Sequence, residues 1–174
     1  LSQLVTKPLN VTWYFFHIFI YFNLCRENTQ KNGERRTFLP FLYFSRICKQ
    51  LTNALHEVAP QTPFRPEEIK LVSGAKFPDI QAEQYYGVEV KTTSSNSWKS
   101  VGSSIVESTR IEDVSMIYML FAKLGGDFAE FRCKPYEDCL DNISLTHQPR
   151  YQIDMELEEK NCQSIFQKMK IDYN

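Results

Sequence analysis

Residues 76–93, KFPDIQAEQYYGVEVKTT, decide the fold that we expect, because they read as two short strands joined by a turn. The second strand, YGVEVK, alternates in character: its valines belong to one face, and Glu89 and Lys91 belong to the other. The first strand is entered through a proline, a position where no hydrogen bond in the interior of a ladder is lost. We predict that residues 77–82 and 86–92 pair as a hairpin.

The segments on either side of the hairpin follow other patterns. Residues 44–58 place apolar side chains at helical spacing opposite a polar stripe, and prolines follow the pattern. After the hairpin, residues 94–104 are rich in serine and predict a loop. Ser104 and Glu107 have the spacing of a capping box, which predicts a helix that runs toward Val114.

Residues 116–122 are almost wholly apolar, which is typical of a strand that is buried on both faces of a sheet. Such a strand needs a covering layer on each side, and we expect helices in both layers. An alternating strand at residues 129–136, a short helix at 137–143 and an extended segment at 150–155 are expected next. This order predicts an α/β fold with a mixed central β-sheet flanked by helices.

The composition limits the classes of protein that fit. A chain of 174 residues suits one domain, and a hydrophobic content of 43% is enough for a sizeable core. Twenty basic and 21 acidic residues give a formal net charge of −1, so the totals carry no electrostatic footprint of nucleic-acid or membrane binding. We divide the chain into an N-terminal segment of uncertain status at residues 1–36, an organised domain at 37–156 and a charged tail at 157–174, where the chain stops abruptly.

Residues 13–22, WYFFHIFIYF, concentrate aromatic side chains ahead of a polar stretch at 26–36. Three interpretations stay open: a buried strand-like or helical element, a segment foreign to the domain, and a membrane anchor. The continuous apolar part is shorter than the roughly 17–25 residues of a membrane-spanning helix, and no small-residue cleavage site follows it. We therefore expect no membrane partner.

The cysteines and histidines give no sign of a metal or disulfide framework. The five cysteines are odd in number, widely spread and without a CxxC pair, and the three histidines have no ligand spacing. This pattern favours reduced thiols in a cytoplasmic protein over a disulfide frame or a zinc site.

Asp79, Glu89 and Lys91 are the residues that point to chemistry, because the predicted hairpin brings all three to one edge of the sheet. Two neighbouring carboxylates repel each other unless a cation lies between them, and hard oxygen ligands suit Mg²⁺. A water bound to that ion is a candidate nucleophile, which Lys91 can orient beside a phosphate. The pattern predicts metal-assisted hydrolysis of a phosphodiester. The alternative is a surface hairpin with an exposed Glu89–Lys91 pair, which leaves Asp79 unexplained.

The Pro-Asp pair at 78–79 followed by Glu-Val-Lys at 89–91 resembles the signature of the PD-(D/E)XK nucleases. The stretch from LVSGAKFPDI through YYGVEVKTTSSNSWKSVGSS to EFRCKPYEDCLDNI is similar to a bacterial restriction endonuclease family within that superfamily, over roughly residues 45–155. The resemblance implies a restriction-endonuclease-like core, dependence on Mg²⁺ and double-stranded DNA as substrate. It also implies the site residues: the metal ligands Asp79 and Glu89, and the catalytic Lys91.

Two basic residues are weaker candidates for DNA contact. Lys99 lies in the serine-rich segment, where hydroxyls, backbone N–H groups and lysines are common phosphate contacts, although a plain linker explains the segment equally well. Arg110 can reach a phosphate or a partner carboxylate, and the sequence favours neither.

These observations predict a type II restriction endonuclease, which hydrolyses double-stranded DNA at a short specific site with Mg²⁺. Enzymes of this class commonly act as homodimers, because a two-fold protein matches a palindromic site, and a cognate DNA methyltransferase is expected to be encoded nearby. Two alternatives stay open. One is a DNA repair or recombination nuclease on the same core, and the other is a truncated, inactive nuclease remnant.

Overall fold

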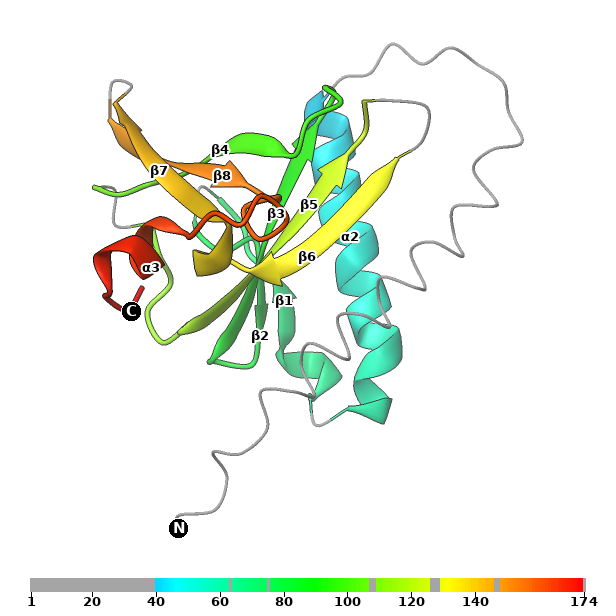
Figure 1. Ribbon diagram of the computed structural model, residues 1–174. Helices are drawn as coiled ribbons and strands as arrows, with labels where there is room; N and C mark the ends of the chain where they lie inside the picture. Colours follow the sequence, from blue (N-terminus) through cyan, green and yellow to red (C-terminus); the bar gives the residue numbers. More distant parts are fainter. Residues whose placement is uncertain are drawn as a thin grey trace.

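The computed structural model describes residues 40–62, 64–74, 76–106, 109–125, 129–145 and 148–173. Within them the chain forms a long helix, a five-stranded sheet, a three-stranded sheet and a short C-terminal helix (Figure 1). The aromatic segment at 13–22 and Glu107 lie outside the described residues. Of the helices that are described, none has the length and apolarity needed to cross a membrane.

The central sheet is mixed and has the strand order β1-β2-β3-β5-β6. Its strands are β1 (Ile69–Leu71), β2 (Ile80–Ala82), β3 (Tyr86–Thr93), β5 (Met116–Lys123) and β6 (Glu130–Pro135). Strands β3 and β5 run parallel, and the other neighbours run antiparallel. The predicted hairpin forms, but over a shorter range than residues 77–82 and 86–92: β2 pairs with β3 from Ala82↔Tyr86 to Ile80↔Val88, and Phe77 instead forms a bridge with Arg110.

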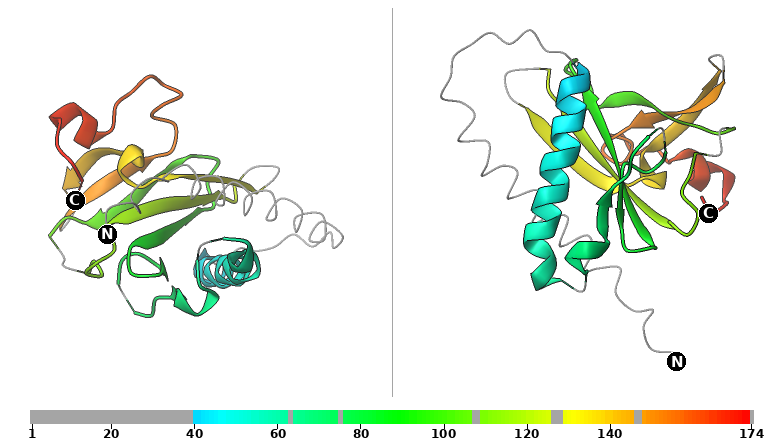
Figure 2. Two further views of the ribbon diagram at one scale, coloured as in Figure 1. Left: turned by 90° about the horizontal axis from the view of Figure 1, so that it is seen from below. Right: turned by 180° about the vertical axis from the view of Figure 1, so that it is seen from behind.

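One face of the central sheet is covered by α2 (Pro40–Val58), which Figure 2 shows in front of the strands in the view from behind. The helix forms where the apolar spacing predicted one. Leu51 and Leu55 are buried in one hydrophobic cluster with Val88 and Val90 of β3. Burying each such side chain contributes about 1.5–3 kcal/mol relative to exposure, so this face alone holds the helix on the sheet.

The opposite face is covered by a second sheet, which corrects our prediction of helices on both sides. This sheet has the order β4-β8-β7, with β4 (Lys99–Ser104), β7 (Leu140–Leu145) and β8 (Pro149–Asp154). Leu140 and Ile153 from the second sheet lie in one cluster with Met119 and Phe121 of β5. Strand β5 is therefore buried on both faces, as its sequence predicted.

The helix predicted from Ser104 toward Val114 is wrong. Ser104 ends β4, where it pairs with Arg150 and donates its hydroxyl hydrogen to Gln148 Oε1 at 3.1 Å, and the described residues 109–115 contain no helix. The expected loop at 94–104 is likewise replaced by β4 in its second half. The short helix predicted at 137–143 is only a 3₁₀ turn before β7. The 3₁₀ turns of the described chain are Ala59–Gln61, Pro66–Glu68 and Glu137–Cys139.

Residues 157–173, which we expected to form a charged tail, return to the second sheet. Leu157 is buried, and α3 (Ile165–Met169) places Phe166 in the second hydrophobic cluster. This helix begins at Ser164, whose side chain and backbone exchange hydrogen bonds with Gln167 in a capping box. The C-terminal segment thereby extends the layer that covers the central sheet (Figure 1).

Candidate active site

Asp79 is held at the point where the pairing of β2 with β3 ends. Its carbonyl oxygen accepts a hydrogen bond from the Val72 N–H at 2.8 Å, and its Oδ2 accepts one from the Val90 N–H at 2.7 Å. Extending the β2–β3 register by two residues places Pro78 opposite Val90. In a continued ladder, the Val90 N–H would bond to the backbone of the residue opposite it, Pro78. Here the Asp79 carboxylate accepts that hydrogen bond instead.

The dipeptide before Asp79 is fixed on two sides. Pro78 packs against the backbone of Gly87 in β3, where an added Cβ would lie only 2.3 Å from Pro78 Cγ. The Phe77 N–H donates to the Thr109 carbonyl at 3.0 Å, and the Phe77 carbonyl accepts from the Ile111 N–H at 2.8 Å. The Phe77–Pro78 peptide bond is cis. Because Phe77 is hydrogen-bonded and Pro78 is packed, the backbone that leads into Asp79 has little room to move.

The three residues singled out in the sequence come together in space. Lys91 Nζ lies 2.6 Å from Glu89 Oε1, and Asp79 is near enough to Glu89 for each carboxyl group to affect the pKa of the other. The Glu89 side chain is 7% exposed, whereas that of Lys91 is 25% exposed. The cluster is therefore a largely buried group of charges that opens to solvent beside the lysine.

Both carboxyl groups of the site have pKa values above the ordinary values of Asp and Glu. Burial raises the pKa of Glu89 to about 7; Lys91 lowers the pKa, and the negative charge of Asp79 raises it. Burial also raises the pKa of Asp79, against the lowering effect of the Val90 N–H and of Lys91. When both carboxyl groups are ionised, they outweigh the single ammonium group, so a divalent cation between them would favour the ionised forms and lower both raised pKa values.

The donor set fits a hard cation such as Mg²⁺. Asp79 and Glu89 supply carboxylate oxygens, and the Val90 carbonyl points to the same side of β3 as the Val90 N–H that binds Asp79. Pro78, opposite that carbonyl, has no N–H to donate to it. Among the described residues, no group of three Asp, Glu, His or Cys side chains forms a metal site. Waters would therefore complete the coordination, which suits Mg²⁺ held by one or two carboxylates.

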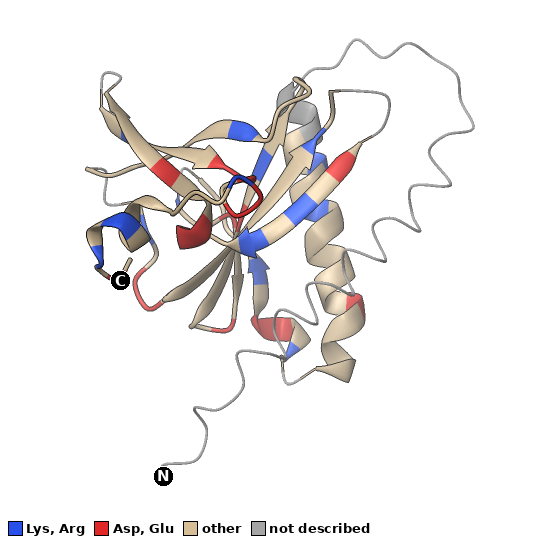
Figure 3. Cartoon of the chain, viewed as in Figure 1, with Lys and Arg blue, Asp and Glu red and all other residues tan. Residues whose placement is uncertain are grey.

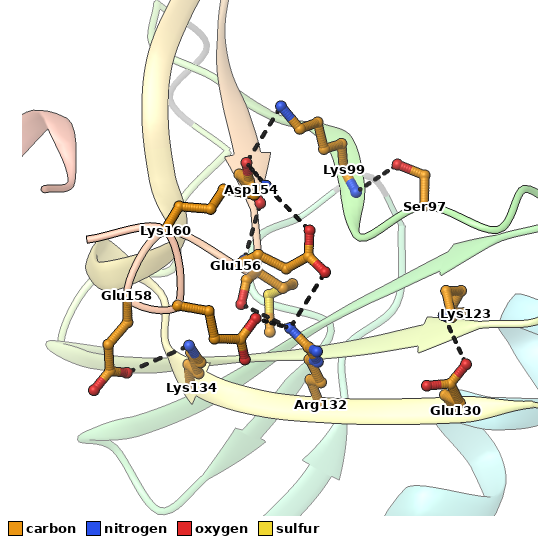
Figure 4. Close-up of polar contacts among 12 residues, drawn as sticks. Ser97, Lys99, Lys123, Glu130, Arg132, Lys134, Asp154, Glu156, Glu158 and Lys160 are labelled. Carbon is orange, nitrogen blue, oxygen red and sulfur yellow. Dashed lines mark hydrogen bonds and ion pairs between the residues drawn. The ribbon is translucent and has the colours of Figure 1, made fainter. Parts of the chain in front are cut away.

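The two weaker candidates have partners within the protein. Lys99 Nζ lies 3.3 Å from Asp154 Oδ2, although the lysine side chain is 62% exposed (Figure 4). Arg110 Nη2 donates to the Val114 carbonyl at 2.9 Å, and its guanidinium lies 4.9 Å from the centre of the Tyr173 ring. These contacts tie β4 to β8 and the 109–114 segment to the C-terminus. A phosphate contact by either residue stays a prediction.

A network of ion pairs extends from Asp154, the last residue of β8, to the basic residues of β6. Asp154 is buried and also accepts from Lys160 Nζ at 2.8 Å. Arg132 on β6 pairs with Glu159 at 2.8 Å and lies near Glu156 (Figure 4). The Arg132 guanidinium also stacks on Trp98, 4.3 Å from the ring centre, and the sequence had placed Trp98 in a loop. Figure 3 shows the acidic and basic residues interspersed over β6 and the C-terminal segment. The cations of β6 are therefore engaged by neighbouring acids.

Two residues that shape the site escaped the sequence reasoning. Gly87 packs against Pro78, the residue before Asp79, where a larger side chain would not fit. An isolated glycine within a strand pattern is a known signal of such a close approach to the backbone. Tyr136 is fully buried beside Phe77, and its position as the last residue of the strand predicted at 129–136 gave no signal. Its role depends on contacts between segments far apart in the chain.

Comparisons with protein-family models, with curated proteins and with solved structures found no match to this chain.

Proposed function

We propose that this protein is a Mg²⁺-dependent endonuclease that hydrolyses phosphodiester bonds of double-stranded DNA, on a core of the restriction-endonuclease-like type. The observation that carries the proposal is the meeting of Asp79, Glu89 and Lys91 at the end of the β2–β3 pairing. A mixed sheet with its longest helix on one face is compatible with that core. A structural hairpin would leave the buried pair of carboxylates without a purpose, because such pairs are costly.

Each residue has a distinct task in this proposal. Asp79 and Glu89 hold the cation, and the Val90 N–H keeps the Asp79 carboxylate turned toward Glu89. When bound, Mg²⁺ lowers the pKa of a coordinated water and stabilises the charge that develops on the phosphate. The Lys91 ammonium has three N–H donors, one of which is used by Glu89, so the others can orient a water or a phosphate oxygen.

Type II restriction at a short specific site is the form of this activity that the motif and its surroundings favour. In that form the protein acts on DNA as a homodimer, because cutting both strands of a palindromic site requires two catalytic clusters related by a two-fold axis. A cognate methyltransferase then protects the host. Discrete fragments from unmethylated plasmid would support this form, whereas nicking only at mismatches or junctions would support a repair or recombination nuclease.

Cleavage of unmethylated plasmid with and without Mg²⁺ tests the proposal. We expect Asp79→Ala and Lys91→Ala to abolish cleavage while circular dichroism stays unchanged, because both side chains act in the site. Lys70→Ala is the matched control, since Lys70 is an exposed lysine on β1. Full activity in either site variant refutes the assignment of residues. A folded wild-type protein that cleaves no DNA at any Mg²⁺ concentration supports the inactive remnant instead.

A further inference from the structure

Tyr136 lies where the second sheet, the central sheet and the loop before Asp79 meet. Its side chain is fully buried, and its backbone N–H donates to the Ile117 carbonyl at 2.8 Å, which fixes it to β5. Its ring contacts the ring of Phe77 edge-on, with 5.1 Å between the ring centres. Tyr136 therefore contacts the residue two positions before the carboxylate of Asp79.

The phenol oxygen attaches this ring to β4. It accepts a hydrogen bond from the Ser103 N–H at 3.3 Å and shares a second one with Ser103 Oγ at 3.0 Å. The close approach needs a small neighbour: a Cβ on Gly102 would lie 3.1 Å from the phenol oxygen. Burial raises the pKa of Tyr136 to about 12, so the phenol keeps its proton at neutral pH. The backbone of Tyr136 is thus held by β5, and its phenol oxygen is held by β4.

From these contacts we infer that Tyr136 is a positioning residue, which sets the place of the metal ligand Asp79 through the ring of Phe77. The backbone of Phe77 is bound to residues 109–111 and Pro78 rests on Gly87. The Phe77 ring is buried in the same cluster as Tyr136, and the contact between the two rings links this dipeptide to β4 and β5. The inference rests on the proposed function, because it treats Asp79 as a metal ligand.

The physical reason is that metal affinity depends on how well the ligands are pre-arranged. Partners that orient a ligand typically contribute about 10–100-fold to metal affinity. Tyr136→Leu leaves space beside Phe77 and removes the link to Ser103, so the loop that carries Asp79 can shift. Tyr136→Phe keeps the ring contact and loses only the hydrogen bonds to Ser103. A purely structural tyrosine would lower stability in both variants without altering metal binding.

Titration of Mn²⁺ followed by electron paramagnetic resonance measures binding independently of cleavage. We expect Tyr136→Leu to weaken Mn²⁺ binding by about tenfold, and Tyr136→Phe to stay closer to the wild type. Phe77→Leu should weaken binding similarly, and the double variant should lose less than the product of the two losses, because both changes break one contact. Leu140→Ala is the control for stability, since Leu140 is buried in the same cluster.

The outcomes separate the two levels of the proposal. Wild-type Mn²⁺ affinity in Tyr136→Leu, together with a loss of stability like that of Leu140→Ala, overturns the positioning role and leaves the nuclease proposal standing. Equal loss of affinity in Leu140→Ala also overturns it, because the effect would then be general. A wild-type protein that binds no Mn²⁺ and cleaves no DNA overturns both.

Discussion

Gly87→Ala is the sharpest single test of how the fold presents Asp79. The added Cβ would lie 2.3 Å from Pro78 Cγ and 2.9 Å from Val114 Cγ1, both in packed surroundings. Carbon atoms in contact are normally about 3.5–4.0 Å apart, so the proline must move by more than about 1 Å. Since Asp79 follows Pro78 directly, its carboxylate moves with the proline.

The expected losses can be measured separately. Overpacking of this size costs about 1–3 kcal/mol of the free energy of unfolding, which lowers the midpoint in urea by roughly 0.5–1.5 M. A displacement of about 1 Å in a catalytic constellation can cost on the order of 100-fold in rate. Urea unfolding followed by circular dichroism gives the first quantity, and the initial rate of Mg²⁺-dependent plasmid cleavage gives the second.

Gly74→Ala provides the matched control. Gly74 has φ +85°, and a Cβ there would meet nothing within 4 Å. Alanine in the left-handed region costs roughly 1–2 kcal/mol, so this variant loses stability without pushing on any neighbour. We expect its cleavage rate to stay at the wild-type level. A wild-type cleavage rate in Gly87→Ala would contradict the prediction that the packing of Pro78 on Gly87 positions Asp79. A loss of cleavage rate in proportion to the loss of stability in both variants would contradict it as well.

Three further predictions follow from other parts of the structure. Asp154→Asn should cost about 2 kcal/mol in urea unfolding; burial raises the pKa of Asp154, but hydrogen bonds from Lys160, the Glu156 N–H and Lys99 leave it below its ordinary value. This contribution to stability is fully present above the unfolded pKa of Asp154, about 3.9, and is lost as pH falls through the lower pKa of the folded state. The urea midpoints of the wild type and of Asp154→Asn should therefore converge in acid, and midpoints that stay apart would contradict the prediction. Lys99→Ala should reduce the salt slope of DNA binding by about one, and an unchanged slope would assign Lys99 to Asp154 alone. Iodoacetamide should modify the exposed Cys162 of the native protein before Cys48, because burial raises the pKa of Cys48 to about 12, and equal rates would argue against that burial.

The elements that the sequence predicted correctly are those whose pattern is local. Helix α2 follows from apolar residues at helical spacing, and the β2–β3 hairpin follows from alternation in YGVEVK. Strand β5 follows from an unbroken apolar run. The pattern also placed Glu89 and Lys91 on one face of β3, because the side chains of a strand alternate with a period of two, and it placed Asp79 at the start of the neighbouring strand, directly before β2.

The second sheet could not be predicted in the same way. Ser104 has a capping-box neighbour in sequence, yet it pairs with Arg150 in β8, and that distant partner is invisible to a local pattern. Trp98 was expected in an exposed polar loop, but its side chain is buried and its ring contacts the cations of Arg132 and Lys123. In both cases tertiary contacts overrode a local preference. The same limit hid Tyr136, whose contacts come from β4 and from the loop before β2.

The second sheet has a consequence for the order of events during synthesis. Strand β4 precedes β5 and β6 in the chain, whereas its partner β8 follows them both. During synthesis, Asp79, Glu89 and Lys91 are therefore made before β8, the strand that pairs with β4. Because a domain generally folds as a unit, the second sheet is complete only after β8 has been synthesised. Under the proposed function, DNA cleavage would therefore require the complete domain, including the C-terminal strand β8.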